Sequence, residues 1–172
     1  NKKESYNRMK IPFSVSARTA MLIGSENFSN PEGAIVELVK NAYDADSHYC
    51  YILFGEDEQN NRILYILDWG TGMTDKIIET CWMRIGTDDK LYNATTESGR
   101  VKSGAKGIGR FALNRLGMKA EMLTFTKDGH GYDWKVNWSD FDKPGTSVSE
   151  ITADIDIISL AVGHQFLSNL GS

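Results

Sequence analysis

The chain has 172 residues, of which 41% are hydrophobic and 24% are charged, so it is neither disordered nor fibrous and has the make-up of one globular domain with a sizeable core. The formal net charge of -4 leaves no basic footprint, and nucleic acid is therefore not indicated as a partner of this segment. No apolar run reaches the length of a membrane span, and no signal-peptide pattern opens the chain, so we expect a protein that does not enter a membrane. Cys50 and Cys81 stand in apolar stretches that favour buried free thiols, and we therefore expect a cytoplasmic protein.

Two helices are expected before the first strand. Apolar residues at helical spacing predict a short helix over roughly residues 14 to 24. A clearer start signal follows at Asn30-Pro31-Glu32. Asn can cap free backbone amides, Pro suits the first helical position, and Glu suits the positive end of the helix dipole.

The second of these helices contains the stretch ELVKNAYDAD, residues 37 to 46. Steps of four and then three residues place Glu37, Asn41 and Asp44 on one narrow stripe, and the apolar residues of the stretch fall on the opposite side. Taken alone, this pattern favours an amphipathic surface helix whose polar face meets water. The rest of the chain must decide whether the stripe has a function.

A β-hairpin and a third helix are expected next. YCYILF at 49 to 54 and RILYILD at 62 to 68 are rich in β-branched and aromatic residues, and a hairpin is their simplest connection. Thr74 can cap a further helix, in which apolar residues recur at helical spacing as far as Ile85.

Residues 86 to 106 have few large apolar side chains and many turn formers, which is typical of a mobile functional loop or a disordered segment. A helix ended by Gly117 follows. Strands are expected at 119 to 126 and 130 to 138, joined by a turn, and a further strand at 146 to 151. The chain should therefore adopt an α+β fold, with a mixed, mostly antiparallel sheet and helices packed on one face.

Two glycine-rich stretches could hold a ligand. DWGTGM at 68 to 73 places an Asp at a strand end before two glycines, so the backbone can approach a flat ligand while the carboxylate accepts hydrogen bonds from an amine. SGAKGIGRFAL at 103 to 113 places glycines at a helix start, where free amides favour a phosphate. Neither is specific by itself: the first can be an ordinary turn, and the second has neither Walker nor Rossmann spacing.

In this order, the motifs resemble those of the GHKL ATPase superfamily, named for DNA gyrase, the ninety-kilodalton heat-shock chaperone, histidine kinases and MutL. ELVKNAYDA at 37 to 45 is similar to the family's Asn-containing helix, DWGTGM to its first glycine box, GAKGIG at 104 to 109 to its second, and GTSV at 145 to 148 to its Gly-Thr box. The resemblance covers residues 14 to about 151. It implies a Bergerat-type two-layer sandwich, formed by a single domain over residues 1 to 172.

The resemblance also implies a site for ATP and Mg²⁺. Asn41 would coordinate Mg²⁺, Glu37 would be the general base, and Asp68 would accept a hydrogen bond from the adenine amine, supported by the hydroxyl of Thr146. The further ATP-binding residues would be Asp44, Gly70, Gly72, Met73, Gly104, Lys106, Gly107, Ile108 and Gly109, with Lys90 as another candidate for a phosphate contact. Residues 86 to 106 would form a lid over the nucleotide.

The implied function is Mg-dependent ATP binding and slow hydrolysis that drives a conformational switch in a larger protein. The presence of Glu37 together with Asp44-Ala45 makes the chain more similar to the gyrase, MutL, chaperone and MORC-like hydrolases than to histidine kinases. Two alternatives stay open. The chain could be a histidine-kinase catalytic domain, or a domain that holds ATP without cleaving it and gates an interaction.

The partners follow from the same resemblance. The chain begins at Asn1 rather than Met, which suggests the N-terminal fragment of a longer protein. A downstream transducer or effector domain of that protein would respond to ATP and ADP, and nucleotide could also drive formation of a homodimer.

Overall fold

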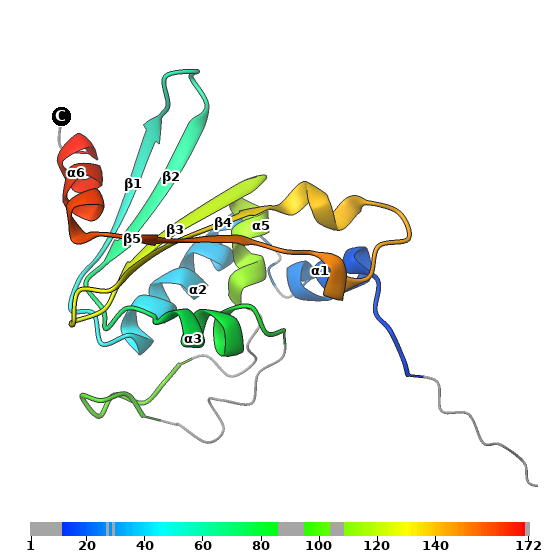
Figure 1. Ribbon diagram of the computed structural model, residues 1–172, viewed down its shortest axis with the longest axis horizontal. Helices are drawn as coiled ribbons and strands as arrows, with labels where there is room; N and C mark the ends of the chain where they lie inside the picture. The colour runs from blue at the N-terminus through cyan, green and yellow to red at the C-terminus, as the bar shows by residue number, and fades with distance from the viewer. Residues whose placement is uncertain (1–11, 27, 29, 86–94, 104–108, 171–172) are drawn as a thin grey trace, which may run out of the picture.

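The computed structural model of the chain describes residues 12–26, 28, 30–85, 95–103 and 109–170 (Figure 1). The helices are α1 (Ala17–Glu26), α2 (Pro31–Asp44), α3 (Asp75–Ile77), α5 (Ala112–Leu116) and α6 (Leu160–Leu170). The strands are β1 (Cys50–Glu56), β2 (Arg62–Asp68), β3 (Lys119–Phe125), β4 (Gly131–Asn137) and β5 (Asp154–Ile158). A π-helical turn (Ile78–Trp82) continues α3, and short 3₁₀ turns occur at Gly109–Phe111, Trp138–Asp142 and Val148–Glu150.

Helix α2 begins where the sequence predicts. The Asn30 side chain accepts a hydrogen bond from the Gly33 amide at 2.8 Å, and Pro31 occupies the first turn. A cap of this kind satisfies one of the amides that have no partner inside a helix. The cap fixes the start of α2 and so sets the position of the polar stripe that follows along it.

Both predicted hairpins are present, and the fold is α+β as expected. β1 pairs with β2 in antiparallel register, with Cys50 opposite Asp68. β3, β4 and β5 form a three-stranded sheet in that order, and every ladder among the described residues is antiparallel. The turn between β3 and β4 closes through Gly129, whose φ of 85° lies in the left-handed region that glycine adopts without strain.

The strand expected at residues 146 to 151 is wrong. Only Ser147 is in a β-bridge, with Ser16, and residues 148–150 form a 3₁₀ turn. The Glu150 carboxylate accepts a hydrogen bond from the Ser147 amide at 2.6 Å, and the spacing of this Ser and Glu is that of a helical capping box, which competes with an extended conformation. The strand that pairs with β4 is β5 instead, and helix α6 follows it.

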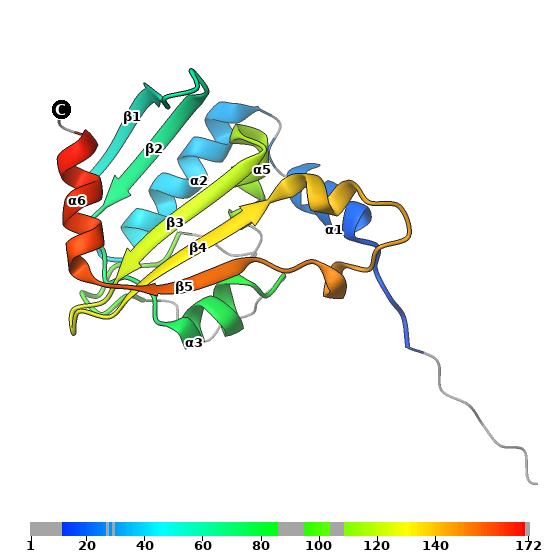
Figure 2. The ribbon, with the colours of Figure 1, turned by 45° about the horizontal axis from the view of Figure 1, so that its top comes forward.

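One face of the three-stranded sheet carries the core. Tyr132, Trp134 and Val136 alternate along β4 toward the helical layer, which includes α1, α2 and α5 (Figure 2). Phe111 lies at the centre of this layer with 1% of its surface exposed, and its ring stands 6.0 Å from that of Trp138. Burial of these aromatic rings supplies much of the hydrophobic stabilisation of the fold.

Helix α6 packs on the opposite face, near the ends of both sheets. A side chain at Gly163 would come within 2.7 Å of the Phe125 ring, so the helix lies almost directly on β3. The rings of Tyr65 on β2 and Phe166 on α6 stand 6.0 Å apart. The helix therefore joins the β1–β2 hairpin to the three-stranded sheet. None of the helices in the described ranges is long and apolar enough to cross a membrane.

Replacing Phe111 tests this account of the core. Phe111→Ala should lower the free energy of unfolding by about 3–5 kcal/mol, because it leaves a cavity among the buried rings. Phe54→Ala is the matched control, since Phe54 is 79% exposed and its loss should change stability by no more than about 0.5 kcal/mol. Urea unfolding followed by tryptophan fluorescence measures both, and equal losses in the two variants would contradict the assignment of the core.

Candidate functional site

Every second backbone amide of the turn at residues 68–73 donates a hydrogen bond to an acceptor outside the turn. The Trp69 amide donates to the Ser47 hydroxyl at 2.8 Å, the Thr71 amide to the Ala45 carbonyl at 2.9 Å, and the Met73 amide to the Thr124 hydroxyl at 2.9 Å. The first two partners follow the end of α2, and the third lies on β3. The turn is therefore fixed between the helix and the three-stranded sheet.

The two hydroxyl groups in this set were not foreseen from the sequence. Ser47 is buried and its hydroxyl also donates to the Tyr49 carbonyl at 2.7 Å, so it links the residues after α2 to the end of β2. Thr124 is buried as well and faces the turn from β3. The available signal was weak, because Ser and Thr are mostly exposed in folded proteins and neither position is marked as buried by the sequence around it.

The two glycines of the turn are required by close backbone approach. A side chain at Gly70 would meet the Ala45 side chain at 2.5 Å, and one at Gly72 would meet the Phe125 carbonyl oxygen at 2.0 Å. Gly72 also has a φ of 72°, in the left-handed region. This glycine pair thus allows α2 and β3 to close on the turn from both sides.

Asp68 begins the turn with an exposed side chain. Its Oδ1 atom accepts a hydrogen bond from the Gly70 amide at 2.8 Å, which leaves Oδ2 as an acceptor toward a ligand. Cys50 lies opposite Asp68 on β1, and burial, with a smaller effect from the Asp68 charge, raises the pKa of its thiol. The thiol is therefore protonated at neutral pH and belongs to the packing beside the carboxylate.

The polar stripe of α2 is half-buried and points into the same region. Glu37 forms an ion pair with Lys40 at 2.6 Å on the same helix face. Asn41 stands one turn further on, and the Asp44 carboxylate accepts a hydrogen bond from the Ser103 amide at 2.8 Å. Since the residues after α2 also hold the 68–73 turn, the stripe and Asp68 are parts of one arrangement.

The second glycine box is described only at its margins. Gly104, Lys106, Gly107 and Ile108 lie outside the described residues, and so does Lys90. Gly109 opens the 3₁₀ turn that leads into α5. Part of the expected lid is described: residues 95–103 form a small hairpin that lies against the end of α2.

Arg110, directly after this glycine box, is a residue that sequence reasoning did not single out. Its guanidinium donates to the carbonyls of Cys81, at 2.9 Å, and Arg84, and it lies 5.9 Å from the Trp82 ring. Burial lowers the pKa of Arg110 to about 10, so the group still carries its charge at neutral pH. It ties the start of α5 to the end of the π-helical turn.

Thr146 is not brought to Asp68. Its carbonyl accepts a hydrogen bond from the Ala17 amide at 2.9 Å, at the start of α1. In Figures 1 and 2 the segment around it lies beside α1, at the opposite end of the molecule from the end of β2. The expected support of adenine by Thr146 therefore finds no counterpart in this arrangement.

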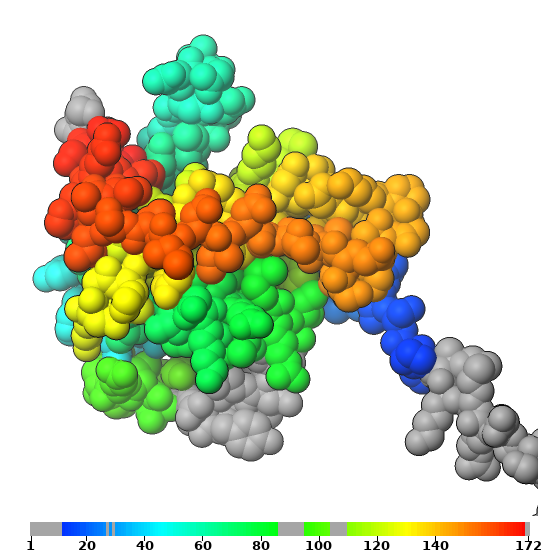
Figure 3. Space-filling model, viewed as in Figure 1, coloured from blue at the N-terminus to red at the C-terminus, as the bar shows by residue number. Residues whose placement is uncertain are grey.

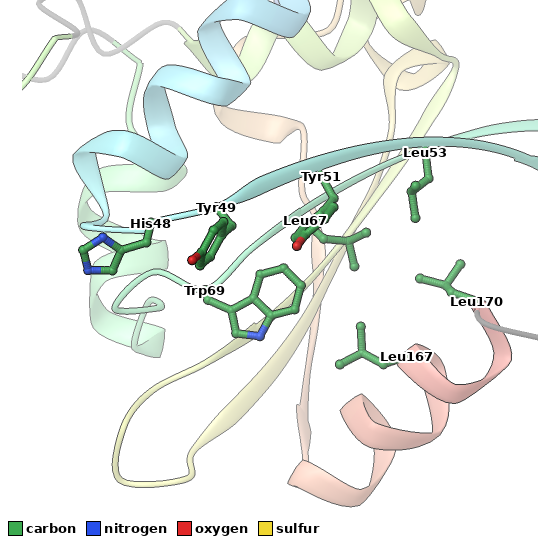
Figure 4. A pocket seen from close by; sticks show the side chains of 8 residues that line it. All are labelled: His48, Tyr49, Tyr51, Leu53, Leu67, Trp69, Leu167 and Leu170. Carbon is green, nitrogen blue, oxygen red and sulfur yellow. The ribbon is translucent and has the colours of Figure 1, made fainter.

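A separate apolar groove of about 610 Å³ lies on the other face of the β1–β2 hairpin (Figure 4). It is lined by His48, Tyr49, Tyr51, Leu53, Leu67, Trp69, Leu167 and Leu170. Side chains alternate between the two faces along a strand, so Leu67 and Trp69 point away from the side on which Asp68 stands. The groove is thus distinct from the region that joins Asp68 to α2.

The chemistry of the α2 stripe fits a hydrated magnesium ion bound to phosphates. Mg²⁺ keeps several waters and takes only one or two protein oxygens beside substrate phosphates, so a single half-buried Asn amide suffices. The described residues contain no cluster of three or more His, Cys, Asp or Glu placed to enclose a metal. Asn41 between Glu37 and Asp44 is consistent with this mode of binding.

Comparison with known proteins places these features in a family. Residues 28–162 match the family described as histidine kinase-, DNA gyrase B- and HSP90-like ATPase. The chain is 32% identical to the putative type II restriction enzyme HgiDII of Herpetosiphon aurantiacus, over 76% of this chain and 20% of that protein. It is 28% identical to the DNA mismatch repair protein MutL of Pediococcus pentosaceus, over 81% of this chain and 21% of that protein. The chain spans about a fifth of the length of the curated relatives it matches, and the matches confirm the resemblance drawn from the motifs.

Two glycines with nearly the same backbone conformation test the closure of the 68–73 turn. Gly72 and Gly145 have φ values of 72° and 74°, but a side chain at Gly145 would meet no atom within 4 Å. Gly72→Ala should therefore lower the free energy of unfolding by about 1–3 kcal/mol more than Gly145→Ala, because only the former collides with the Phe125 carbonyl. Chemical denaturation compares the two, and equal losses would mean that the turn has room beside β3.

Proposed function

Because this chain belongs to the family of histidine kinase-, DNA gyrase B- and HSP90-like ATPases, we propose that it binds Mg-ATP between α2 and the 68–73 turn and hydrolyses it slowly. One observation carries the proposal. The backbone amides of Trp69 and Thr71 are bonded to residues that directly follow α2, so the carboxylate of Asp68 is held in fixed relation to the helix that carries Glu37 and Asn41.

At the adenine end, Asp68 acts as the hydrogen-bond acceptor for the exocyclic amine. This role is supported by the different positions of its two oxygen atoms. Oδ1 accepts a hydrogen bond from the Gly70 amide and so holds the turn, while Oδ2 is available for the ligand. Gly70 and Gly72 let the turn after Asp68 lie close against Ala45 and Phe125, and Met73 follows them at the edge of the core.

At the phosphate end, Asn41 supplies an oxygen ligand to Mg²⁺ on the nucleotide, and Asp44 organises the same helix face. The bound ion supplies positive charge against the phosphate oxygens. The backbone amides of Gly104, Gly107, Ile108 and Gly109 receive the phosphates, Lys106 adds a positive charge, and residues 86–106 cover the nucleotide as a lid.

Glu37 is the general base that orients a water molecule against the terminal phosphate and accepts its proton. It stands one helical turn before Asn41, which puts its carboxylate beside the phosphates rather than beside the base. In the structure the carboxylate pairs with Lys40 at 2.6 Å. A partly exposed pair of this kind contributes little free energy and can exchange its partner readily.

The hydrolysis cycle would act as a conformational switch in a longer, cytoplasmic protein. A downstream transducer or effector domain would respond to the bound nucleotide, and nucleotide binding would drive formation of a homodimer. One of the relatives is named a DNA mismatch repair protein, and the other a putative type II restriction enzyme. On that ground we place the switch in a protein that acts on DNA through a region outside this chain. The net charge of -4 agrees with a regulatory rather than a DNA-contacting role for the domain itself.

The adenine contact is tested by Asp68→Asn. The Asn oxygen can still accept from the Gly70 amide, but an amide nitrogen then faces the adenine amine, and two donors cannot pair. ATP affinity should fall by about tenfold or more, while the midpoint of thermal unfolding stays unchanged. Calorimetric titration measures the affinity, and Asp75→Asn, an exposed Asp outside the site, is the control. Unchanged affinity in Asp68→Asn would remove this residue from the site.

The phosphate end is tested by two variants of the same helix. Glu37→Ala should keep ATP affinity and lower single-turnover hydrolysis by roughly 10²–10⁴ fold, because it removes the base but no ligand contact. Asn41→Ala should weaken binding of Mg-ATP itself, because it removes an oxygen ligand of the cation. Hydrolysis by Glu37→Ala at the parent rate would remove Glu37 as the general base. Binding of ATP without hydrolysis by the parent protein would instead favour a domain that holds ATP without cleaving it, or a histidine-kinase catalytic domain.

A further inference from the structure

Asp46, just beyond the end of α2, holds an unusual conformation for a residue with a side chain. Its φ is 64°, in the left-handed region that few residues other than glycine adopt. In this conformation its carboxylate is directed at the 95–103 hairpin, where it accepts hydrogen bonds from the Thr96 hydroxyl at 2.5 Å and from the Ser98 amide at 3.0 Å. The Ser98 hydroxyl donates to the same carboxylate.

Arg100 makes the reverse connection, from the hairpin to the end of α2. Its guanidinium donates to the Ser47 carbonyl at 2.8 Å, lies 5.0 Å from the centre of the Tyr43 ring, and has its Nε atom 3.8 Å from the Asp46 carboxylate. Its other terminal nitrogen lies 3.3 Å from Nδ1 of His48. The hairpin is thus held to the helix end from both sides by half-buried charged groups.

The hairpin itself is closed by its own backbone. Thr95 and Val101 form a β-bridge, the Thr96 amide donates to the Arg100 carbonyl at 2.9 Å, and Gly99 takes the tight corner with a φ of 85°. Residues 95–103 form the green lobe below the yellow turn in Figure 3. Because this hairpin is closed by its own hydrogen bonds, its attachment to α2 fixes the positions of both Thr95 and Ser103.

One end of the hairpin reaches the site directly. Ser103 donates through its amide and its hydroxyl to the Asp44 carboxylate, at 2.8 and 3.2 Å, and Asp44 is the last residue of the polar stripe. Ser103 also directly precedes Gly104, the first residue of the second glycine box. The attachment therefore determines where the chain enters that box relative to α2.

We propose that Asp46 and Arg100 are positioning residues, which set the affinity for the phosphates of the nucleotide by anchoring the 95–103 hairpin to the end of α2. This inference rests on the proposed function. Neither residue touches the nucleotide. Their contribution is to hold the entry to the second glycine box in place before the ligand arrives, so that less conformational entropy is lost on binding.

The charge of Asp46 agrees with this role. Hydrogen bonds from Ser98 and Thr96, with a smaller effect from the Arg100 charge, lower the pKa of its carboxyl to about 2. The group is therefore ionised throughout the neutral range, and its hydrogen bonds to hydroxyl and amide donors have the added strength of a charged acceptor.

Asp46→Gly is the sharpest test, because glycine adopts the same φ without strain and only the carboxylate is lost. ATP affinity should fall by about tenfold, whereas affinity for adenosine, which has no phosphate, should stay at the parent value. Trypsin cleavage after Arg100 should become faster as the hairpin detaches, while the urea midpoint of the domain stays unchanged or rises. Arg100→Gln should weaken ATP binding in the same direction.

Glu97→Gln is the matched control, since Glu97 is on the same hairpin but its side chain is 82% exposed. The substitution removes an ion pair with Lys127, whose atoms are 3.9 Å apart. It should leave ATP affinity and cleavage unchanged. Faster cleavage of Asp46→Gly with unchanged ATP affinity would overturn the positioning role, and so would equal losses for ATP and adenosine. Failure of the parent protein to bind ATP at all would instead overturn the proposed function, which separates the two failures.

Discussion

The structure depends on one constraint, which is the attachment of the 68–73 turn to two layers at once. Three alternate amides of the turn find their acceptors outside it, on Ser47, Ala45 and Thr124. These contacts give each of the three amides a hydrogen-bond acceptor within the protein. They connect the two-stranded hairpin to both α2 and the three-stranded sheet.

This constraint explains the division of the β1–β2 hairpin into two faces with different properties. One face carries Asp68, the acceptor that we propose for adenine, at the start of the turn that is bonded to the residues after α2. The other face carries Tyr51 and Trp69, whose rings stand 5.5 Å apart, beside α6. Aromatic rings that lie on the far side of a strand cannot contribute to the site, although they are close to it in sequence.

The end of α2 is the second point on which the arrangement converges. Three consecutive residues provide these contacts: Asp44 bonds to Ser103, Ala45 to the 68–73 turn, and Asp46 to the 95–103 hairpin. The motifs of this chain that are similar to those of the family are far apart in sequence, at 37 to 45, 68 to 73 and 104 to 109. Here the helix end that carries the first motif also holds the neighbours of the other two, which couples the proposed adenine and phosphate regions through one short stretch of backbone.

The sequence by itself determined the family, the start of α2, the two hairpins and the grouping of Glu37, Asn41 and Asp44 on one stripe, because caps, strand alternation and helical spacing are local properties of the chain. It could not decide between a strand and a turn at 146 to 151, where a Gly-Thr string similar to a family motif competed with a capping box at Ser147 and Glu150. Only the tertiary structure revealed that Thr146 lies beside α1, that the Ser47 and Thr124 hydroxyls hold the first glycine turn, and that Asp46 and Arg100 anchor residues 95–103. Each of these depends on contacts between residues that are distant along the chain, and such contacts form only when the layers pack.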